Sequence, residues 1–74
     1  MNQNNPKLEV LLFMAREPLT LEQLSRYLES SPEEIQTALN ELAAKYASSE
    51  HGIQIVNVSN GWEFATKPEY SKLL

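Results

Sequence analysis

The strongest constraint on this chain is a repeated signal for the start of a helix. In a capping box, a Ser or Thr is followed three residues later by Glu or Gln, and each side chain bonds a backbone N–H that the first helical turn leaves unpaired. Three helix starts are marked by such a pair: Thr20 with Gln23, Ser31 with Glu34, and Thr66 with Glu69. A chain of 74 residues with three helix starts has room for short helices and one small hydrophobic core.

Apolar spacing predicts where the first three helices run. The first is expected over residues 6–16, because Pro18 cannot continue it. The second is short and follows Thr20. The third follows Ser31, is favoured by Pro32 at its first position, and ends near residue 48. Its predicted buried face is a stripe at helical spacing: Ile35, Leu39, Leu42 and Tyr46, with Ala38 and Ala43.

Beyond Gly52 the pattern changes to that of a β-hairpin. Residues 53–58 are rich in β-branched side chains, but Ile55 and Val56 are adjacent, which predicts either a bulge or a strand packed on both faces. Asn60-Gly61 predicts the hairpin turn, since both residues tolerate positive φ. Both glycines of the chain are therefore assigned to turns.

The segment after the turn is predicted to return as a second strand. Trp62 and Phe64 fall on one face of it, where packing against the core is expected. The third capping box then predicts a last helix over residues 68–74.

The order of these elements indicates the fold class. It is helix, short extended piece, helix, helix, strand, turn and strand, which is the order of a winged helix. We predict an α+β, mainly helical fold, a winged helix-turn-helix with a short two-stranded wing. Residues 1–5 are expected to form a flexible N-terminal tail, and residues 6–74 a single winged-helix domain.

Composition excludes several classes of function. The chain has no cysteine, which removes disulfide scaffolds and thiolate metal sites. No apolar run approaches the roughly 18 residues of a membrane span, and the first residues do not resemble a signal peptide. Six basic against ten acidic residues give a net charge of −4, which disfavours binding to nucleic acid or anionic membranes. These features predict a cytoplasmic protein.

No catalytic, cofactor-binding or metal-binding residues are predicted. His51 is the only histidine and is expected to be a solvated loop residue without metal-ligating neighbours. The chain has no phosphate-binding glycine loop and no pair of acidic residues in an evident pocket. We therefore do not expect an enzyme or a cofactor.

The main alternative is a winged-helix DNA-binding transcriptional regulator. In such a protein the third helix enters the major groove, and basic residues on helix and wing contact phosphates. Here that helix carries Glu33, Glu34 and Glu41 against Lys45, and the predicted hairpin tip has no basic residue. The sequence therefore disfavours direct binding to nucleic acid.

The first helix has more apolar surface than a core requires. Leu8, Leu11, Leu12 and Ala15 fill one face, and a second apolar face remains at i, i+3 and i+4 spacing. The candidates for a protein interface are the residues of that second face: Val10, Phe13 and Met14. Two interpretations are open, since either a partner protein or the predicted last helix would cover it.

Three segments carry a resemblance to a known family. They are LEVLLF at residues 8–13, EPLTLEQL at residues 17–24 and GWEFATKPEY at residues 61–70. In this order and separation they resemble the segregation and condensation protein B family, and the likeness covers roughly residues 7–74.

The resemblance implies a function in chromosome condensation, chromosome segregation and the cell cycle. Family members are bacterial homodimers that bind the kleisin subunit, segregation and condensation protein A, and through it the structural maintenance of chromosomes protein. The resemblance thus implies a non-enzymatic adaptor that pairs with a second copy and is associated with the nucleoid through the complex. Because family members contain two winged-helix domains, the chain is expected to be an N-terminal fragment of a longer protein.

Overall fold

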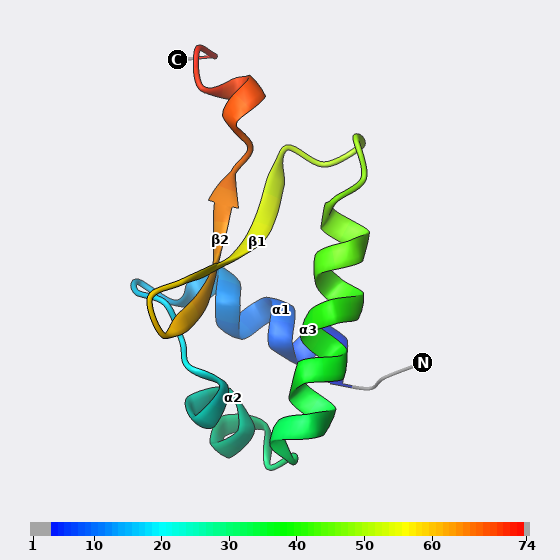
Figure 1. Ribbon diagram of the computed structural model, residues 1–74, viewed down its shortest axis with the longest axis vertical. Coiled ribbons are helices and arrows are strands. Elements are labelled where there is room, and N and C mark those ends of the chain that lie inside the picture. The colour runs from blue at the N-terminus through cyan, green and yellow to red at the C-terminus, as the bar shows by residue number, and fades with distance from the viewer. Residues whose placement is uncertain (1–3, 74) are drawn as a thin grey trace.

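The computed structural model describes residues 4–73, which form three helices, a two-stranded hairpin and a short 3-10 turn. The elements follow the predicted order: α1 (Asn4–Met14), α2 (Leu21–Leu28), α3 (Pro32–Tyr46), β1 (Ile53–Val58), β2 (Gly61–Thr66) and the 3-10 turn Pro68–Tyr70. The hairpin runs alongside the C-terminal half of α3, and the 3-10 turn extends beyond it, at the end of the molecule opposite α2 (Figure 1). The predicted winged-helix fold is confirmed.

The first two predicted capping boxes are formed. The Gln23 backbone N–H donates to the Thr20 hydroxyl at 3.0 Å, and the Thr20 N–H donates to the Gln23 side-chain oxygen at 2.9 Å. Ser31 and Glu34 exchange the equivalent bonds at 3.1 and 3.2 Å. Each cap stabilises its helix by about 1 kcal/mol, so α2 and α3 begin where the local sequence directs.

The third predicted capping box is wrong. Thr66 is the last residue of β2, where it pairs with Ile53, and the next N–H, of Lys67, donates to the Gly52 carbonyl at 2.9 Å. The hydrogen bonds of the hairpin therefore continue past the point where a cap would begin. The predicted helix over residues 68–74 is absent as far as residue 73, and the segment contains only the 3-10 turn. Leu74 lies outside the described residues.

Lys67 is a buried charged residue, and no pattern in the sequence predicts its burial. Its side chain is only 6% exposed, and its Nζ donates to the Ser48 carbonyl at 2.7 Å. Together with the bond from its backbone N–H to Gly52, this contact ties the end of β2 to the loop between α3 and β1. The start of the C-terminal turn is thereby held against the domain.

The hairpin differs from the prediction in its turn. Pairing runs without interruption from Ile53 opposite Thr66 to Val58 opposite Gly61, so β1 has no bulge. The turn residues are Ser59 and Asn60, one position earlier than predicted, and the positive φ of 51° belongs to Ser59. The alternative to a bulge was a strand packed on both faces. The structure agrees with that alternative, since adjacent residues of β1 are half-buried on both faces.

Gly61 belongs to β2 and not to the turn, and the close approach of another segment requires glycine at this position. It packs against the extended segment before α2, where Leu19 and Trp62 exchange two backbone hydrogen bonds of 3.0 and 2.8 Å. A Cβ atom on Gly61 would lie 2.6 Å from Pro18 Cβ, closer than side chains can approach. Only glycine lets the two backbones come this close.

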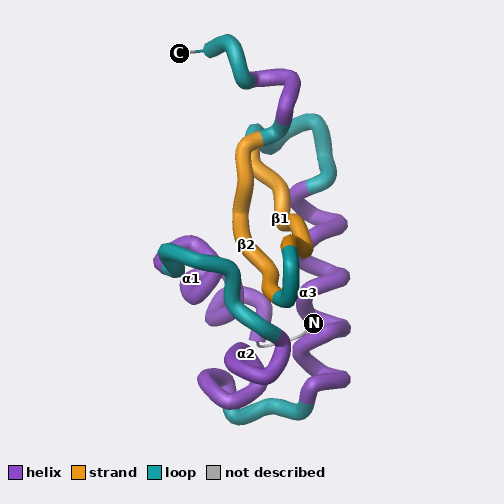
Figure 2. Tube along the Cα trace, turned by 60° about the vertical axis from the view of Figure 1, so that its left-hand side comes forward, coloured by secondary structure: helices purple, strands orange, loops and turns teal. Residues whose placement is uncertain are grey.

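The core lies between the three helices and the inner face of the hairpin. Its buried residues are Leu8, Leu12, Leu24, Ile35, Ala38, Leu39, Leu42 and Tyr46. The predicted stripe of α3 supplies most of them. Trp62 and Phe64 pack against this cluster as predicted, and the hairpin lies between α1 and α3 (Figure 2).

The bounds of α1 differ by two residues at each end from the prediction. The helix begins at Asn4, so Asn4 and Asn5 belong to the helix and not to the predicted tail. Their side chains explain this, since Asn4 Nδ2 donates to Ser30 Oγ at 2.8 Å and Asn5 Nδ2 donates to Glu41 Oε1 at 3.2 Å. These bonds hold the first turn against the segment leading into α3 and α3 itself.

Candidate functional site

The candidate interface residues all lie on the outer face of α1. Val10, Phe13 and Met14 are 54%, 77% and 73% exposed, whereas Leu8 and Leu12 on the inner face are almost fully buried. The helical period separates the two sets, because positions i, i+3 and i+4 share a face. The structure thus places the three predicted residues together in solvent.

A shallow apolar groove adjoins this face of α1. It has a volume of about 470 Å³, and its lining residues are Glu9, Val10, Phe13, Met14, Tyr46, Ile53 and Phe64. The three residues that come from α3 and the hairpin were not identified from the sequence as part of a surface. Their side chains meet α1 only through the tertiary fold, so spacing along the chain does not reveal them.

The predicted alternative, a C-terminal helix covering α1, is wrong for the described residues. No residue of segment 67–73 lines the groove beside α1. The C-terminal turn instead extends past the open end of the hairpin, away from α1 (Figure 1). The outer face of α1 is therefore uncovered by the part of the chain that the structure describes.

A polar contact joins α1 to the end of α3 within the groove. The Tyr46 hydroxyl donates to the Glu9 carboxylate, and the Tyr46 ring lies against the rings of Phe64 and His51, with centroids 5.0 and 4.7 Å apart. The hydrogen bond to Glu9, together with burial and the negative charge of Glu9, raises the pKa of Tyr46 above its ordinary value of 10.0. Glu9, the one polar residue from Leu8 to Ala15, is the only sequence signal for this contact.

The Tyr46–Glu9 contact predicts how stability depends on pH. Because the pKa of Tyr46 is higher in the folded than in the unfolded chain, its contribution is complete below pH 10.0 and is lost as the pH rises through the raised pKa. We expect Tyr46→Phe to lower the free energy of unfolding by about 1–2 kcal/mol at neutral pH. The difference between the two proteins should shrink above pH 10.0 in urea unfolding followed by circular dichroism. A difference that stays constant with pH would contradict this assignment.

His51 was expected to be a solvated loop residue, but the structure does not expose it in this way. It is half-buried, and its ring packs on Tyr46. Among residues 4–73 no three side chains of the metal-ligating types gather into a possible metal site. The structure thus gives His51 a packing role at the end of α3.

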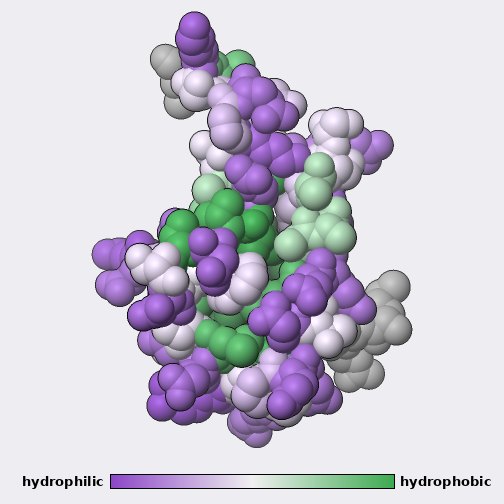
Figure 3. Space-filling model, in the orientation of Figure 1, coloured by the Kyte–Doolittle hydropathy of each residue, from purple (hydrophilic) through white to green (hydrophobic). Residues whose placement is uncertain are grey.

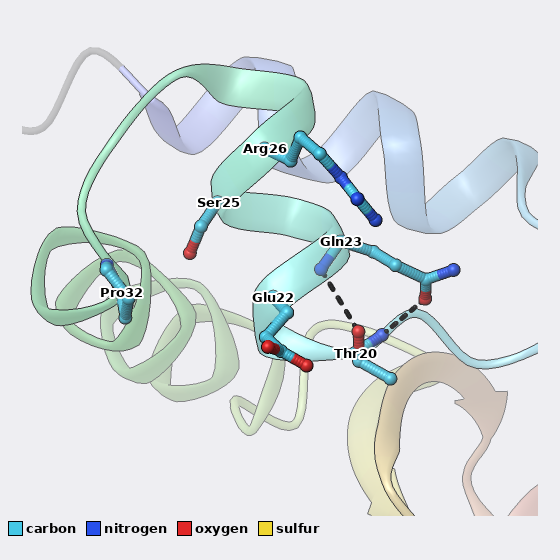
Figure 4. A pocket seen from close by; sticks show the side chains of 6 residues that line it. All are labelled: Thr20, Glu22, Gln23, Ser25, Arg26 and Pro32. Atoms are coloured by element: carbon cyan, nitrogen blue, oxygen red, sulfur yellow. Dashed lines mark hydrogen bonds between the residues drawn. The ribbon is translucent and has the colours of Figure 1, made fainter.

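A second hollow lies at the start of α2. It has a volume of about 620 Å³ and is lined by Thr20, Glu22, Gln23, Ser25, Arg26 and Pro32. Figure 4 shows that Thr20 and Gln23 use their polar atoms on each other in the capping box. Glu22 and Arg26 balance in charge. This hollow is accounted for by the helix start and offers no concentrated charge to a ligand.

The surface that a DNA-binding winged helix would use is acidic here. Glu33, Glu34 and Glu41 are exposed on α3, and the hairpin turn carries no basic residue. Polar side chains of this helix bond within it, since Gln36 Nε2 donates to Asn40 Oδ1 at 3.1 Å and Thr37 Oγ1 donates to the Glu33 carbonyl at 3.0 Å. The geometry therefore provides no cluster of phosphate contacts.

Apolar surface is also visible beyond α1. In Figure 3 hydrophobic residues emerge at the middle of the face in view, over the strands and beside α3, inside a rim of polar residues. An apolar patch with a polar rim is typical of a surface that contacts another protein.

No helix within residues 4–73 has the length and hydropathy needed to cross a lipid bilayer.

Comparisons with known proteins agree on one family. The family model described as "Segregation and condensation complex subunit ScpB" matches residues 6–74. A segregation and condensation protein B from Desulforamulus reducens is 41% identical over 68 residues, which are 92% of this chain and 38% of the relative. One from Clostridium acetobutylicum is 36% identical over 64 residues, or 86% and 32% of the two chains. The chain thus spans about a third of the length of the curated relatives it matches.

Solved structures support the same assignment. A dimer of the ScpB N-terminal domain complexed with an ScpA peptide is similar with a TM-score of 0.89 and 33% identity, covering 93% of this chain and 86% of that chain. ScpB from Mycobacterium tuberculosis shares the fold with a TM-score of 0.87 at 23% identity, covering 93% of this chain and 43% of the other. From its match over nearly its whole length and from its fold, this chain belongs to the ScpB family of segregation and condensation complex subunits.

Proposed function

We propose that this chain is a non-enzymatic adaptor domain of the bacterial condensin complex. It acts in chromosome condensation and segregation by pairing with a second copy and by binding the kleisin ScpA, and so works in the cytoplasm, where the chromosome lies. Family membership and the related dimer with its ScpA peptide support this proposal. The proposal further equates the chain with the first of the family's two winged-helix domains.

The observation that carries the proposal is the uncovered apolar face of α1. Val10, Phe13 and Met14 stand in solvent beside an apolar groove. Exposed apolar surface of this kind costs free energy in water and is a usual mark of a protein contact. We assign these three residues to the contact between two copies.

The alternative of a DNA-binding transcriptional regulator lacks such an observation. Of its two contact elements, α3 carries Lys45 against Glu33, Glu34 and Glu41, the hairpin turn has no charged residue, and the whole chain has a net charge of −4. With one basic residue on these elements, there is little counterion release to drive association with a duplex. Protein contacts are therefore the better-supported function.

Two titrations by fluorescence anisotropy test this choice. One uses a labelled DNA duplex at about 50 mM salt, where electrostatic binding is strong. The other uses a labelled ScpA peptide that corresponds to the peptide in the related dimer structure. We expect the peptide to bind and the duplex not to bind. Duplex binding that weakens steeply with salt, without peptide binding, would overturn the proposal.

A further inference from the structure

A second patch of exposed apolar side chains lies on the C-terminal turn. Leu73 is 79% exposed and Tyr70 is 42% exposed. They line a groove of about 580 Å³ together with His51, Ile53 and Thr66 at the open end of the hairpin. This groove has no role in the fold described above.

The C-terminal turn is held in place by a series of hydrogen bonds. After Lys67 is tied to the loop before β1, the N–H groups of Tyr70, Ser71 and Leu73 donate to carbonyls three residues earlier at 3.0, 3.0 and 3.1 Å. The Tyr70 ring also packs over Gly52, where a Cβ would be 3.9 Å from two ring atoms. The turn therefore presents Leu73 to solvent from a defined position.

The two apolar grooves share a lining residue. Ile53 lines both of them. Tyr46 of the α1 groove also lies against His51 of the C-terminal groove, with ring centroids 4.7 Å apart. Five of the six exposed large hydrophobic residues among those described line one of these two grooves, which together are called the strip below, and only Tyr27 lies elsewhere.

Area favours a contact that uses both ends of the strip. At the exposed fractions given, the three side chains of α1 offer roughly 400 Å², against about 800 Å² per partner in a standard interface. Adding Tyr70 and Leu73 brings the total to roughly 600 Å² before any surrounding residue is counted.

We infer that the strip from α1 across Ile53 to the C-terminal turn is one surface, and that its occupant is a second copy of this chain. The inference rests on the proposed self-association and extends it to Tyr70 and Leu73. Because a twofold dimer uses the same surface on both copies, every substitution on the strip acts twice.

Sedimentation equilibrium of three glutamate variants tests the inference, at about 0.15 M salt to screen long-range repulsion. Leu73→Glu should raise the Kd of self-association by about tenfold or more. Tyr27→Glu adds the same charge to an exposed apolar residue off the strip and should stay within about threefold of wild type. Phe13→Glu reports on the α1 face. Circular dichroism confirms that each variant is folded.

The other outcomes overturn the inference in distinguishable ways. If Phe13→Glu dissociates the dimer and Leu73→Glu does not, the α1 face acts alone and the proposed function stands. If Tyr27→Glu weakens association as much as Leu73→Glu, the effect is general charge repulsion. If the wild-type chain is monomeric and Leu73→Glu weakens binding of the labelled ScpA peptide, the occupant is that peptide. If the wild-type chain neither associates nor binds the peptide, the proposed function fails as well.

Discussion

Phe13→Glu is expected to abolish self-association while leaving the fold intact. Phe13 is exposed on the outer face of α1, so the domain loses little packing when the ring is removed. In a twofold dimer the substitution removes two aromatic rings and brings two carboxylates into an apolar contact. We expect the Kd to rise by about 100-fold or more.

Sedimentation equilibrium measures this effect, with Tyr27→Glu as the matched control on α2. Urea unfolding of the monomeric variant then checks the fold. An unfolded Phe13→Glu variant would mean that Phe13 is part of the core. A folded variant that associates as well as wild type would exclude the α1 face from the contact.

Gly61→Ala is expected to cost about 3 kcal/mol of stability, the upper part of the range for overpacking. The new methyl group would lie 2.6 Å from Pro18 Cβ and 2.9 Å from the Pro18 carbonyl carbon. Relief requires moving the backbone apart, which weakens the paired hydrogen bonds between Leu19 and Trp62. A domain of this length has roughly 4–11 kcal/mol of stability in all, so the variant should lose roughly a quarter to three quarters of it.

Gly52→Ala is the matched control for this prediction. A Cβ on Gly52 would meet only the Tyr70 ring at 3.9 Å, which is ordinary contact, and no glycine in the described chain has a positive φ. Its free energy of unfolding in urea should change by less than about 1 kcal/mol. Equal stability losses for Gly52→Ala and Gly61→Ala would contradict the steric account.

Local signals in the sequence predict the helices well. Thr20 and Ser31 cap α2 and α3 as their spacing indicates, because a capping box involves only residues three positions apart. The winged-helix order and the packing of Trp62 and Phe64 are predictable from the same kind of short-range pattern.

The predictions fail where contacts between segments distant in the sequence determine the local structure. Thr66 has the spacing of a cap, but its pairing with Ile53 keeps it in a strand. Gly61 resembles a turn residue, yet its position depends on the approach of Pro18, 43 positions earlier in the sequence. Sequence spacing carries no information on either approach.

The candidate site divides in the same way. Its α1 half, Val10, Phe13 and Met14, is predictable from helical period. The groove beside it is not, since Tyr46 reaches Glu9 across 37 positions of sequence and Ile53 arrives from the hairpin. The proposed extension of the surface to Leu73 is not predictable either. The sequence pattern favours a C-terminal helix there, but the segment forms a turn.

We propose that this domain pairs with itself through its exposed apolar surface. Sedimentation equilibrium of the wild-type chain, at concentrations rising to about 1 mM so that even weak pairs are populated, tests it most directly. We expect a molar mass that rises from 8.4 kDa toward twice that value. A mass that stays at 8.4 kDa over the whole range would contradict it.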